Sequence, residues 1–359
     1  VLAIKYRVVD EDGHALGGPF YYIEKGMGSG WKWLAKIFAF FGVLVGLMGI
    51  GTITQVNGIV NALTNFFDPN NAHTVSVPGV GRYSIVVVIG AALVTIFVAL
   101  VLIGGIKRIS NVAQFIVPFM AIIYVAFCVI LLVCNVTAIP AAIKVIVKGA
   151  FCPKAVTGGL VGSVIVAMQK GVARGIFSNE AGLGSAPIAA AAAQTHEPVR
   201  QGLVSMTGTF IDTIVICTMT GLSIVLTGAW QVKGLEGVQV TTYAFQHGLP
   251  FSSEVAAFML MLCLVFFAFT TILGWDYYSE RCLEYLVGGQ KKTILVYRWL
   301  YIFVVFIGPF LTVSAVWTIA DIVNGLMAVP NMIAIFALNG VVVKETRDFF
   351  ARMKNESYE

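Results

Sequence analysis

Long apolar runs are the feature of this sequence that most constrains its fold. A helix needs about 20 mostly apolar residues to cross a lipid bilayer. Eight runs reach or exceed that length, and they occupy residues 33–66, 84–106, 110–134, 160–193, 202–228, 255–287, 293–314 and 317–343. The first run is too long to stand upright as one helix, so we expect it to tilt or protrude.

The composition supports a membrane protein. Charged residues make up only 11% of the chain, against roughly 25% in a typical soluble domain. A soluble fold of 359 residues could not cover its surface with so few charges. The runs lack strand-like alternation with regular turns, which a membrane barrel would need. We therefore predict an all-α polytopic membrane protein whose surroundings are the lipid bilayer.

The residue types that carry chemistry exclude several classes of function. The four histidines lie in polar stretches, whereas a membrane haem needs histidine ligands inside the spans. None of the six cysteines forms a CxxC pair, and the basic residues are scattered, which argues against a nucleic-acid partner. The runs contain no metal or nucleophile cluster, so we expect no cofactor and no enzyme activity.

Lysine and arginine residues indicate the orientation, because cytoplasmic loops carry more of both. If the N-terminal segment is cytoplasmic, the basic residues of the outer loops are Arg82, Lys144, Lys148, Lys154 and Lys233. Most other loop lysines and arginines then lie on the cytoplasmic side, as does the tail 344–359. The sequence therefore predicts a multi-pass protein of the cell membrane with a cytoplasmic C-terminus.

We expect a single membrane domain over residues 1–359. Its outer segment 135–158 includes Ile139–Phe151, an apolar stretch with two lysines one helical turn apart, which is typical of a helix at the membrane surface. The outer loop 229–254 is long enough to fold over the bundle. The chain opens with four apolar residues before Lys5, as at the end of a span, so we expect it to begin partway through a longer protein.

The most informative segment is Gly171–Pro187, where glycines and a proline interrupt a run that also carries Ser178, Asn179 and Glu180. Inside a bilayer every backbone N–H and C=O needs a partner, so such a stretch must be buried in protein or line a cavity. Transporters place broken helices of this kind at the midplane, around substrate and ion sites. The alternative is a tightly packed helix with a mild kink, and the polar residues favour a functional break.

Other polar side chains also lie within the runs. Thr270 and Thr271 offer hydroxyls to a hard cation such as Na⁺, although threonines in spans commonly bond to their own helix instead. Gln55 could bind a zwitterion or pair with a neighbouring helix. Asp212 lies near the middle of its run, where an acid is either functional or paired with a basic residue such as Arg174.

On these motifs the sequence resembles the alanine or glycine:cation symporter family. The similarity rests on long literal strings at Phe177–Pro187, Pro198–Gly202 and Gly208–Thr213, with further matches at Gly17–Glu24 and Val341–Glu345. Together these strings extend over essentially the whole chain, so chance agreement is negligible.

The resemblance implies a leucine-transporter-type fold, a bundle with two inverted repeats of five helices. On that template residues 1–134 would be a truncated first repeat, residues 159–343 the second repeat and residues 344–359 a cytoplasmic tail. The N-terminal helices, including the first core helix that forms half of the family's site, would be missing from this chain.

The resemblance also implies secondary active transport of small neutral amino acids such as alanine and glycine, driven by Na⁺ and in some members by H⁺. The residues implied to line the substrate site are Phe177, Ser178, Asn179, Gly182, Trp275 and Gln55. Asn179 would be a polar contact, Phe177 a wall and Trp275 the closing side. Thr270 and Thr271 would supply oxygens to the ion.

Two further functions stay open at this point. One is a proton-coupled amino-acid transporter of the same fold, in which Asp212 or Glu180 would be the better ion-binding candidate. The other is an ion channel, which would need symmetric pore-lining rings or a repeated filter. One broken helix is a single site, so the sequence favours a symporter over a channel.

Overall fold

The computed structural model describes residues 1–9, 15–77, 81–151 and 160–356. Its α-helices are α1 (Leu2–Lys5), α2 (Pro19–Gly26), α3 (Lys32–Met48), α4 (Ile53–Phe67), α5 (Ile85–Ile103), α6 (Gly105–Cys134), α7 (Ile139–Phe151), α8 (Leu160–Asn179), α9 (Ala186–Ala190), α10 (Pro198–Thr209), α11 (Thr218–Leu226), α12 (Val238–Gly248), α13 (Ser253–Val287), α14 (Lys291–Ile307), α15 (Val313–Ala337) and α16 (Asn339–Glu356). The 3₁₀ turns are η1 (Ser29–Trp31), η2 (Val136–Ala138), η5 (Ala229–Gln231) and η6 (Gly308–Phe310), and η4 (Phe210–Cys217) is a π-helix. Two antiparallel hairpins pair β1 (Val8–Val9) with β2 (Ala15–Leu16) and β3 (Thr74–Val77) with β4 (Gly81–Ser84).

Within the described ranges, seven helices are long and apolar enough to cross a membrane. They cover Ser29–Phe67, Ile85–Ile103, Arg108–Cys134, Pro198–Leu226, Ser253–Val287, Lys291–Phe310 and Val313–Ala337. The predicted all-α polytopic membrane fold is therefore confirmed. The eighth predicted run, 160–193, instead forms α8 and the short helix α9 with a break between them.

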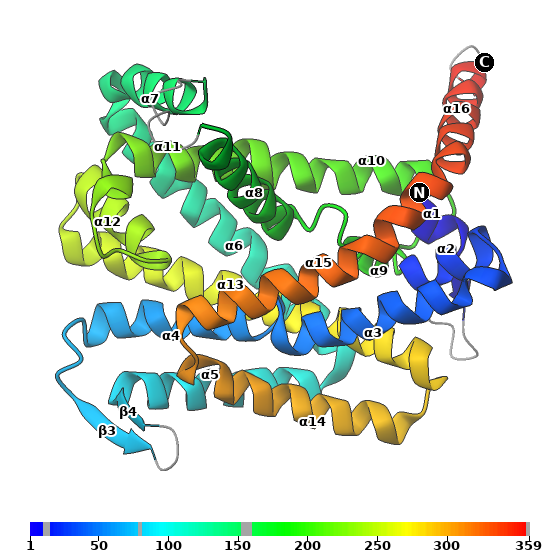
Figure 1. Ribbon diagram of the computed structural model, residues 1–359, viewed down its shortest axis with the longest axis horizontal. Helices are drawn as coiled ribbons and strands as arrows, with labels where there is room; N and C mark the ends of the chain where they lie inside the picture. The colour runs from blue at the N-terminus through cyan, green and yellow to red at the C-terminus, as the bar shows by residue number, and fades with distance from the viewer. Residues whose placement is uncertain (10–14, 78–80, 152–159, 357–359) are drawn as a thin grey trace.

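The long helices run roughly side by side along the bundle (Figure 1). At one end lie α7, α12 and the β3–β4 hairpin, which the sequence analysis assigns to the outer side (Figure 1). At the other end lie α1, α2, α16 and both chain ends, which it assigns to the cytoplasm (Figure 1). The fold thus separates the two predicted sides to opposite ends, as a spanning bundle requires.

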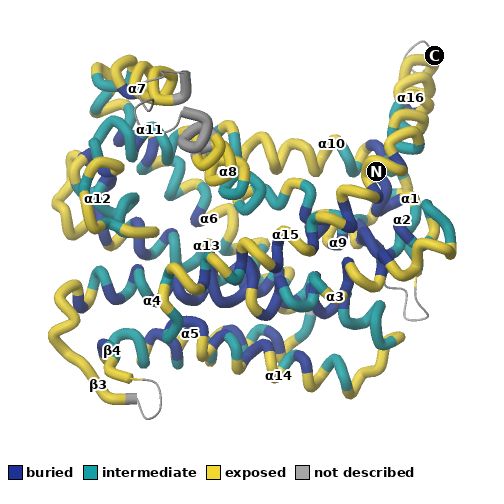
Figure 2. Tube along the Cα trace, in the orientation of Figure 1, coloured by how far each residue is buried: buried dark blue, intermediate teal, exposed yellow. Residues whose placement is uncertain are grey.

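The best-buried part of the bundle is where α13 and α15 pack against α3 (Figure 2). Phe38, Trp275 and Met327 meet there with at most 1% of each residue exposed. By contrast, Phe115 and Phe336 are 77% and 74% exposed. Large exposed apolar side chains are expected on a surface that faces lipid.

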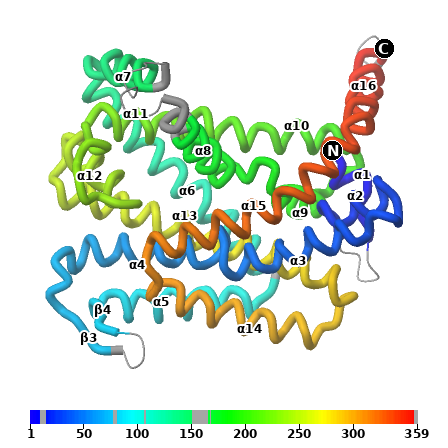
Figure 3. The backbone as a smooth tube through the Cα atoms, in the orientation of Figure 1, coloured from blue at the N-terminus to red at the C-terminus, as the bar shows by residue number. Residues whose placement is uncertain are grey.

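Hydroxyl residues define where three of the long helices begin. The side chains of Ser84, Ser252 and Thr312 accept hydrogen bonds from backbone N–H groups in the first turns of α5, α13 and α15. Helix α13 then continues for 35 residues to Val287 and is followed by Gly288, whose φ of 65° suits glycine. This helix consequently passes α3, α4, α6 and α12 without interruption (Figure 3).

The first run, which is expected to tilt or protrude because of its length, is not one continuous helix. It forms α3 and α4, with a non-helical step at Gly49–Thr52 between them. The Thr52 hydroxyl satisfies the freed Gly46 carbonyl. At Gly51 an added Cβ would lie 2.6 Å from the Trp275 Cβ, so α13 crosses the step where only glycine fits. The close crossing, which the local sequence does not reveal, explains the break.

Candidate functional site

The predicted break after α8 is present. Helix α8 ends at Asn179, α9 begins at Ala186, and the chain between them turns through Glu180, Gly182 and Gly184 at φ values of 56°, 77° and 89°. Left-handed backbone is common for glycine but costs energy for Glu180. The mildly kinked helix is therefore wrong for this segment, and the strained position is an acid within the break.

Glu180 is held in the break by two donors. The Ser185 hydroxyl donates to Oε2, and the Trp275 indole Nε1 donates to Oε1 over 2.9 Å. Trp275 is only 1% exposed, so it lies behind the break. In this conformation Trp275 holds the break to α13 and does not line the cavity described below.

Asn179 and Gly182 tie the break to two other helices. The Asn179 Nδ2 donates to Thr213 Oγ1 on η4 over 2.9 Å, and its Oδ1 accepts from the Ala181 N–H over 2.9 Å. The Gly182 carbonyl accepts from Asn331 Nδ2 on α15 over 2.9 Å. Both predicted substrate residues therefore have structural partners and lie outside the cavity lining.

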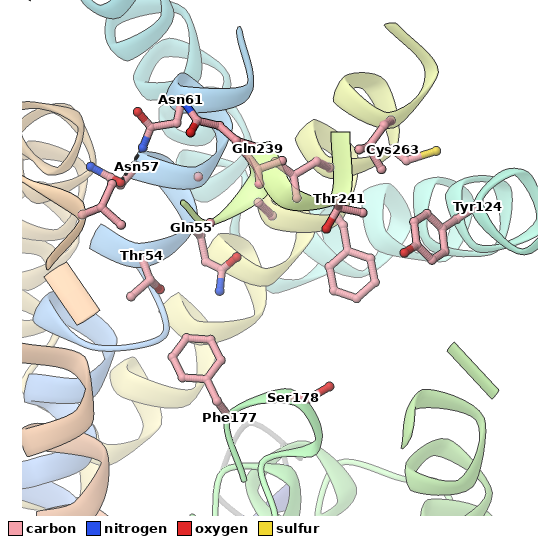
Figure 4. A pocket seen from close by; sticks show the side chains of 18 of the residues that line it. Thr54, Gln55, Asn57, Asn61, Tyr124, Phe177, Ser178, Gln239, Thr241 and Cys263 are labelled. Atoms are coloured by element: carbon pink, nitrogen blue, oxygen red, sulfur yellow. Dashed lines mark hydrogen bonds between the residues drawn. The ribbon is translucent and has the colours of Figure 1, made fainter. Parts of the chain in front are cut away.

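A cavity of about 660 Å³ opens beside the break. Its walls come from α4, α6, α8, η4, α12, α13, α15 and the loop before α12. Three predicted substrate residues, Gln55, Phe177 and Ser178, line it. Figure 4 shows Gln55 reaching from α4 toward Phe177, with Ser178 beside it at the end of α8. The structure thus brings together the first half of the break and α4, as the sequence analysis expects.

Asp212 supplies a carboxylate to this cavity. Its Oδ2 accepts from the Ser178 hydroxyl over 2.7 Å. Arg174 pairs instead with Asp321 over 2.6 Å, so the pairing of Asp212 with Arg174 that the sequence left open is wrong. A second acid, Glu236, lines the cavity from the loop before α12.

An aromatic wall bounds the cavity at α8 and α15. The rings of Phe177 and Trp317 lie 4.7 Å apart between centroids, and both line the cavity. The Arg174 guanidinium lies 4.3 Å from the Trp317 centroid and 5.6 Å from the Phe177 centroid, in cation–π range. The sequence pointed to Phe177 as a wall, whereas Trp317 carried no signal beyond being aromatic.

The outer loop folds over the cavity, as the length of residues 229–254 predicts. Helix α12 packs against α13 and α4. Gln239 lines the cavity and donates through Nε2 to Asn65 Oδ1 on α4 over 3.2 Å. This segment therefore forms part of the cavity wall at the predicted outer end.

The two threonines of the predicted ion site bond to their own helix. Thr270 Oγ1 lies 3.1 Å from the Phe266 carbonyl and 3.0 Å from the Phe267 carbonyl, and Thr271 Oγ1 lies 2.9 Å from the latter. Each hydroxyl retains oxygen lone pairs that a cation can use. Across the described residues no cluster of His, Cys, Asp and Glu could hold a metal ion. The Na⁺ site at Thr270 and Thr271 stays a prediction.

The sequence analysis assigns no role to Asp276, a buried acid on α13. It lies within the run 255–287 and is 1% exposed. The rule that pointed to Asp212, an acid well inside an apolar run, applies equally to Asp276.

Comparison with known proteins gives consistent matches along the chain. The family model described as the sodium:alanine symporter family matches residues 1–359. An uncharacterized transporter of Haemophilus influenzae is 52% identical over 360 residues, which cover 100% of this chain and 74% of that protein. The sodium/alanine symporter AgcS of Methanococcus maripaludis is 44% identical over 365 residues, covering 99% and 74%. The probable sodium/glutamine symporter GlnT of Bacillus subtilis is 36% identical over 356 residues, covering 98% and 68%.

Proposed function

This chain belongs to the sodium:alanine symporter family and is a cation-coupled amino-acid symporter, and we propose that it carries small neutral amino acids such as alanine and glycine with Na⁺ as the coupling ion. The name of the AgcS relative supports alanine and Na⁺, whereas GlnT is named a probable symporter of glutamine. We place the protein in the cell membrane, with the N-terminal segment and α16 in the cytoplasm.

The observation that carries this proposal is the carboxylate of Asp212 in a cavity beside a broken helix. A neutral amino acid is a zwitterion, so its site needs an acceptor for the ammonium group. The Asp212 carboxylate supplies that acceptor, and the Ser178 hydroxyl orients it over 2.7 Å. Gln55 lines the facing wall, where its Nε2 is fixed by a bond to the Ile50 carbonyl over 3.0 Å.

Selection for small side chains would come from the wall of Phe177 and Trp317. A cavity of about 660 Å³ far exceeds one alanine, so the substrate would share it with water in this conformation. Aromatic packing at one end would then set the size limit. Steric exclusion is needed because one extra methylene is otherwise discriminated by only about 1–3 kcal/mol.

The broken helix supports alternating access. Its non-helical segment is tied to α13 through Glu180 and Trp275, to η4 through Asn179, and to α15 through Gly182. Transporters of this kind rock one bundle against another around a midplane site. These bonds are the links through which such a movement would open the cavity to one side or the other.

Counterflow in sealed proteoliposomes tests the substrate and the acceptor together. Vesicles preloaded with alanine should take up labelled alanine, and glycine should compete better than leucine. Asp212→Asn should weaken the apparent affinity for alanine about tenfold for each 1.4 kcal/mol of lost ammonium binding. Glu236→Gln removes another acid from the same cavity and serves as the matched control.

Equal losses of alanine affinity in Asp212→Asn and Glu236→Gln would contradict a specific role for Asp212, because they would mean that alanine binding depends only on the overall charge of the cavity. Absence of alanine counterflow in the wild type, with counterflow of another amino acid intact, would overturn the substrate assignment.

A further inference from the structure

Asp276 is a buried acid that the proposed transport site does not use. It lies on α13, is 1% exposed, and its Oδ1 has no hydrogen-bond partner among the described residues. An ionised carboxylate in such a place needs a counter-ion or several donors, since burying an unpaired charge is very costly. The environment of Asp276 therefore decides which form the carboxyl group takes.

The neighbouring arginines are committed to other acids. One turn further along α13, Glu280 is bound by Arg298 of α14, whose Nη2 lies 2.8 Å and 2.7 Å from its two oxygens. Arg281 pairs with Glu284 over 2.7 Å and lies 3.6 Å from Glu280. These two arginines neutralise the charges of two acids, so neither is left as a counter-ion for Asp276, the third acid.

Hydroxyl groups around Asp276 also point elsewhere. One turn before it, the Ile272 carbonyl accepts from the Tyr301 hydroxyl over 2.7 Å. Asp276 thus faces α14 between that contact and the Glu280–Arg298 pair. The Ser279 hydroxyl donates to the Trp275 carbonyl over 2.7 Å. A Na⁺ ion would need a shell of free oxygens, whereas a proton needs only one.

We propose that Asp276 is a proton-binding site, separate from the amino-acid cavity, and that its carboxyl group is neutral at physiological pH. A neutral carboxyl group requires no counter-ion, which fits the pairing of both nearby arginines with other acids. Loss of the proton would leave a net negative charge between α13 and α14, at the level where α13 crosses the step between α3 and α4.

None of the ionisable groups named around this site provides a free counter-ion for an ionised Asp276, because each either disfavours a further negative charge or is already paired. On α13 they are Glu280 and Arg281, and on α14 they are Tyr297, Arg298 and Tyr301. Glu180, from the break, contacts the adjacent Trp275. Neutral Asp276 keeps α13 packed, so we expect alkaline pH to destabilise this packing and to slow transport.

Difference infrared spectroscopy of the intact protein in lipid vesicles tests protonation directly. The wild type at neutral pH should show a protonated carboxyl band that shifts in D₂O, disappears at alkaline pH and is missing from Asp276→Asn. Asp348→Asn, at an exposed position of α16, is the control and should leave the band unchanged. If Asp276→Asn does not fold, Asp276→Glu should move the same band.

A spectrum of Asp276→Asn that matches the wild type would overturn the proposal, as would a band whose loss depends on Na⁺ at constant pH. The transport arm rests on the proposed function. Under a fixed Na⁺ gradient, wild-type alanine uptake should fall at alkaline pH, whereas Asp276→Asn uptake should stay level. Parallel declines in both proteins would contradict the role of Asp276. Lack of uptake in every protein would refute the substrate assignment and leave the infrared result standing.

Discussion

The Trp275 indole donates a hydrogen bond to Glu180 Oε1 over 2.9 Å and so joins the middle of α13 to the break between α8 and α9. Trp275 is four residues after Thr271, which places both on one face of α13. The proposed ion site and the broken helix are therefore linked through one turn of a continuous helix. This link offers a physical route for coupling ion binding to movement of the break.

Removal of the indole donor should impair transport. In Trp275→Phe, Glu180 keeps the Ser185 hydroxyl but loses its second donor. An unsatisfied buried group costs about 1–3 kcal/mol, so we expect maximal alanine uptake to fall roughly tenfold. Trp299→Phe, at a residue 57% exposed on α14, is the matched control and should transport normally. Normal uptake in both variants would show that the Glu180 contact is dispensable.

Asn179 and Thr213 should act as a coupled pair. Their side chains share a hydrogen bond of 2.9 Å between α8 and η4. Asn179→Ala should lower alanine uptake sharply at equal surface expression, and Thr213→Ala should lower it less. If the bond carries the effect, the double variant should be no worse than Asn179→Ala, with a coupling energy of about 0.5–3 kcal/mol in a double-mutant cycle. Strictly additive losses would argue against the pair.

Thr271→Ala should raise the Na⁺ concentration that gives half-maximal alanine uptake, and Thr270→Ala should do so equally or less. A cation at membrane depth must replace its water shell with protein oxygens. Because ion and substrate binding are linked reciprocally, saturating Na⁺ should restore much of the lost alanine affinity. Thr→Ser at each position keeps the oxygen and should preserve coupling. If the Na⁺ dependence is unchanged in both Thr→Ala variants, the hydroxyls do not bind the ion and only form hydrogen bonds within their own helix.

Acid stability should depend on Ser84, the last residue of β4 and the N-cap of α5. Its hydroxyl donates to Asp68 Oδ2 over 2.5 Å and, with the Ala72 and His73 N–H groups, holds the pKa of Asp68 below its usual range. A depressed folded-state pKa contributes stability above the unfolded-state pKa, and that stability is lost as pH falls through the folded-state pKa.

Ser84→Ala should therefore lower the melting temperature most at neutral pH, and the difference from wild type should shrink as acid protonates Asp68. Ser252→Ala removes an equivalent hydroxyl cap from α13 without a carboxylate partner, so its deficit should not depend on pH. Melting curves in detergent across the acid range measure both. Parallel pH profiles for the two variants would contradict the role of Asp68.

Much of the architecture follows from the sequence because the bilayer imposes strong rules. The number and position of most spans, the surface stretch Ile139–Phe151 as a helix and the break after Asn179 are all visible in apolar length and glycine placement. The step at Gly49–Thr52 is not predicted because it depends on the side chain of the distant Trp275, which packs against Gly51. The local sequence contains no information on where α13 crosses α3 and α4.

The site was less predictable than the fold. Phe177, Ser178 and Gln55 do meet at one cavity, because a break exposes the end of α8 to a facing helix. Trp275 lies behind the break, a placement that depends on which face of α13 meets Glu180. The pairing of Asp212 with Arg174, one of the two alternatives that the sequence left open, fails for a similar reason, since the partner of Arg174 is Asp321, from a helix far along the chain. Tertiary pairings of this kind need the packed structure.

The measurement that tests the central claim most directly is Na⁺-driven accumulation of labelled alanine in proteoliposomes at equal internal and external pH. The account predicts that an inward Na⁺ gradient drives alanine above its external concentration, and that an outward alanine gradient in turn drives labelled Na⁺ out. Accumulation that follows a proton gradient and ignores Na⁺, or alanine flux that only equilibrates, would contradict Na⁺-coupled symport.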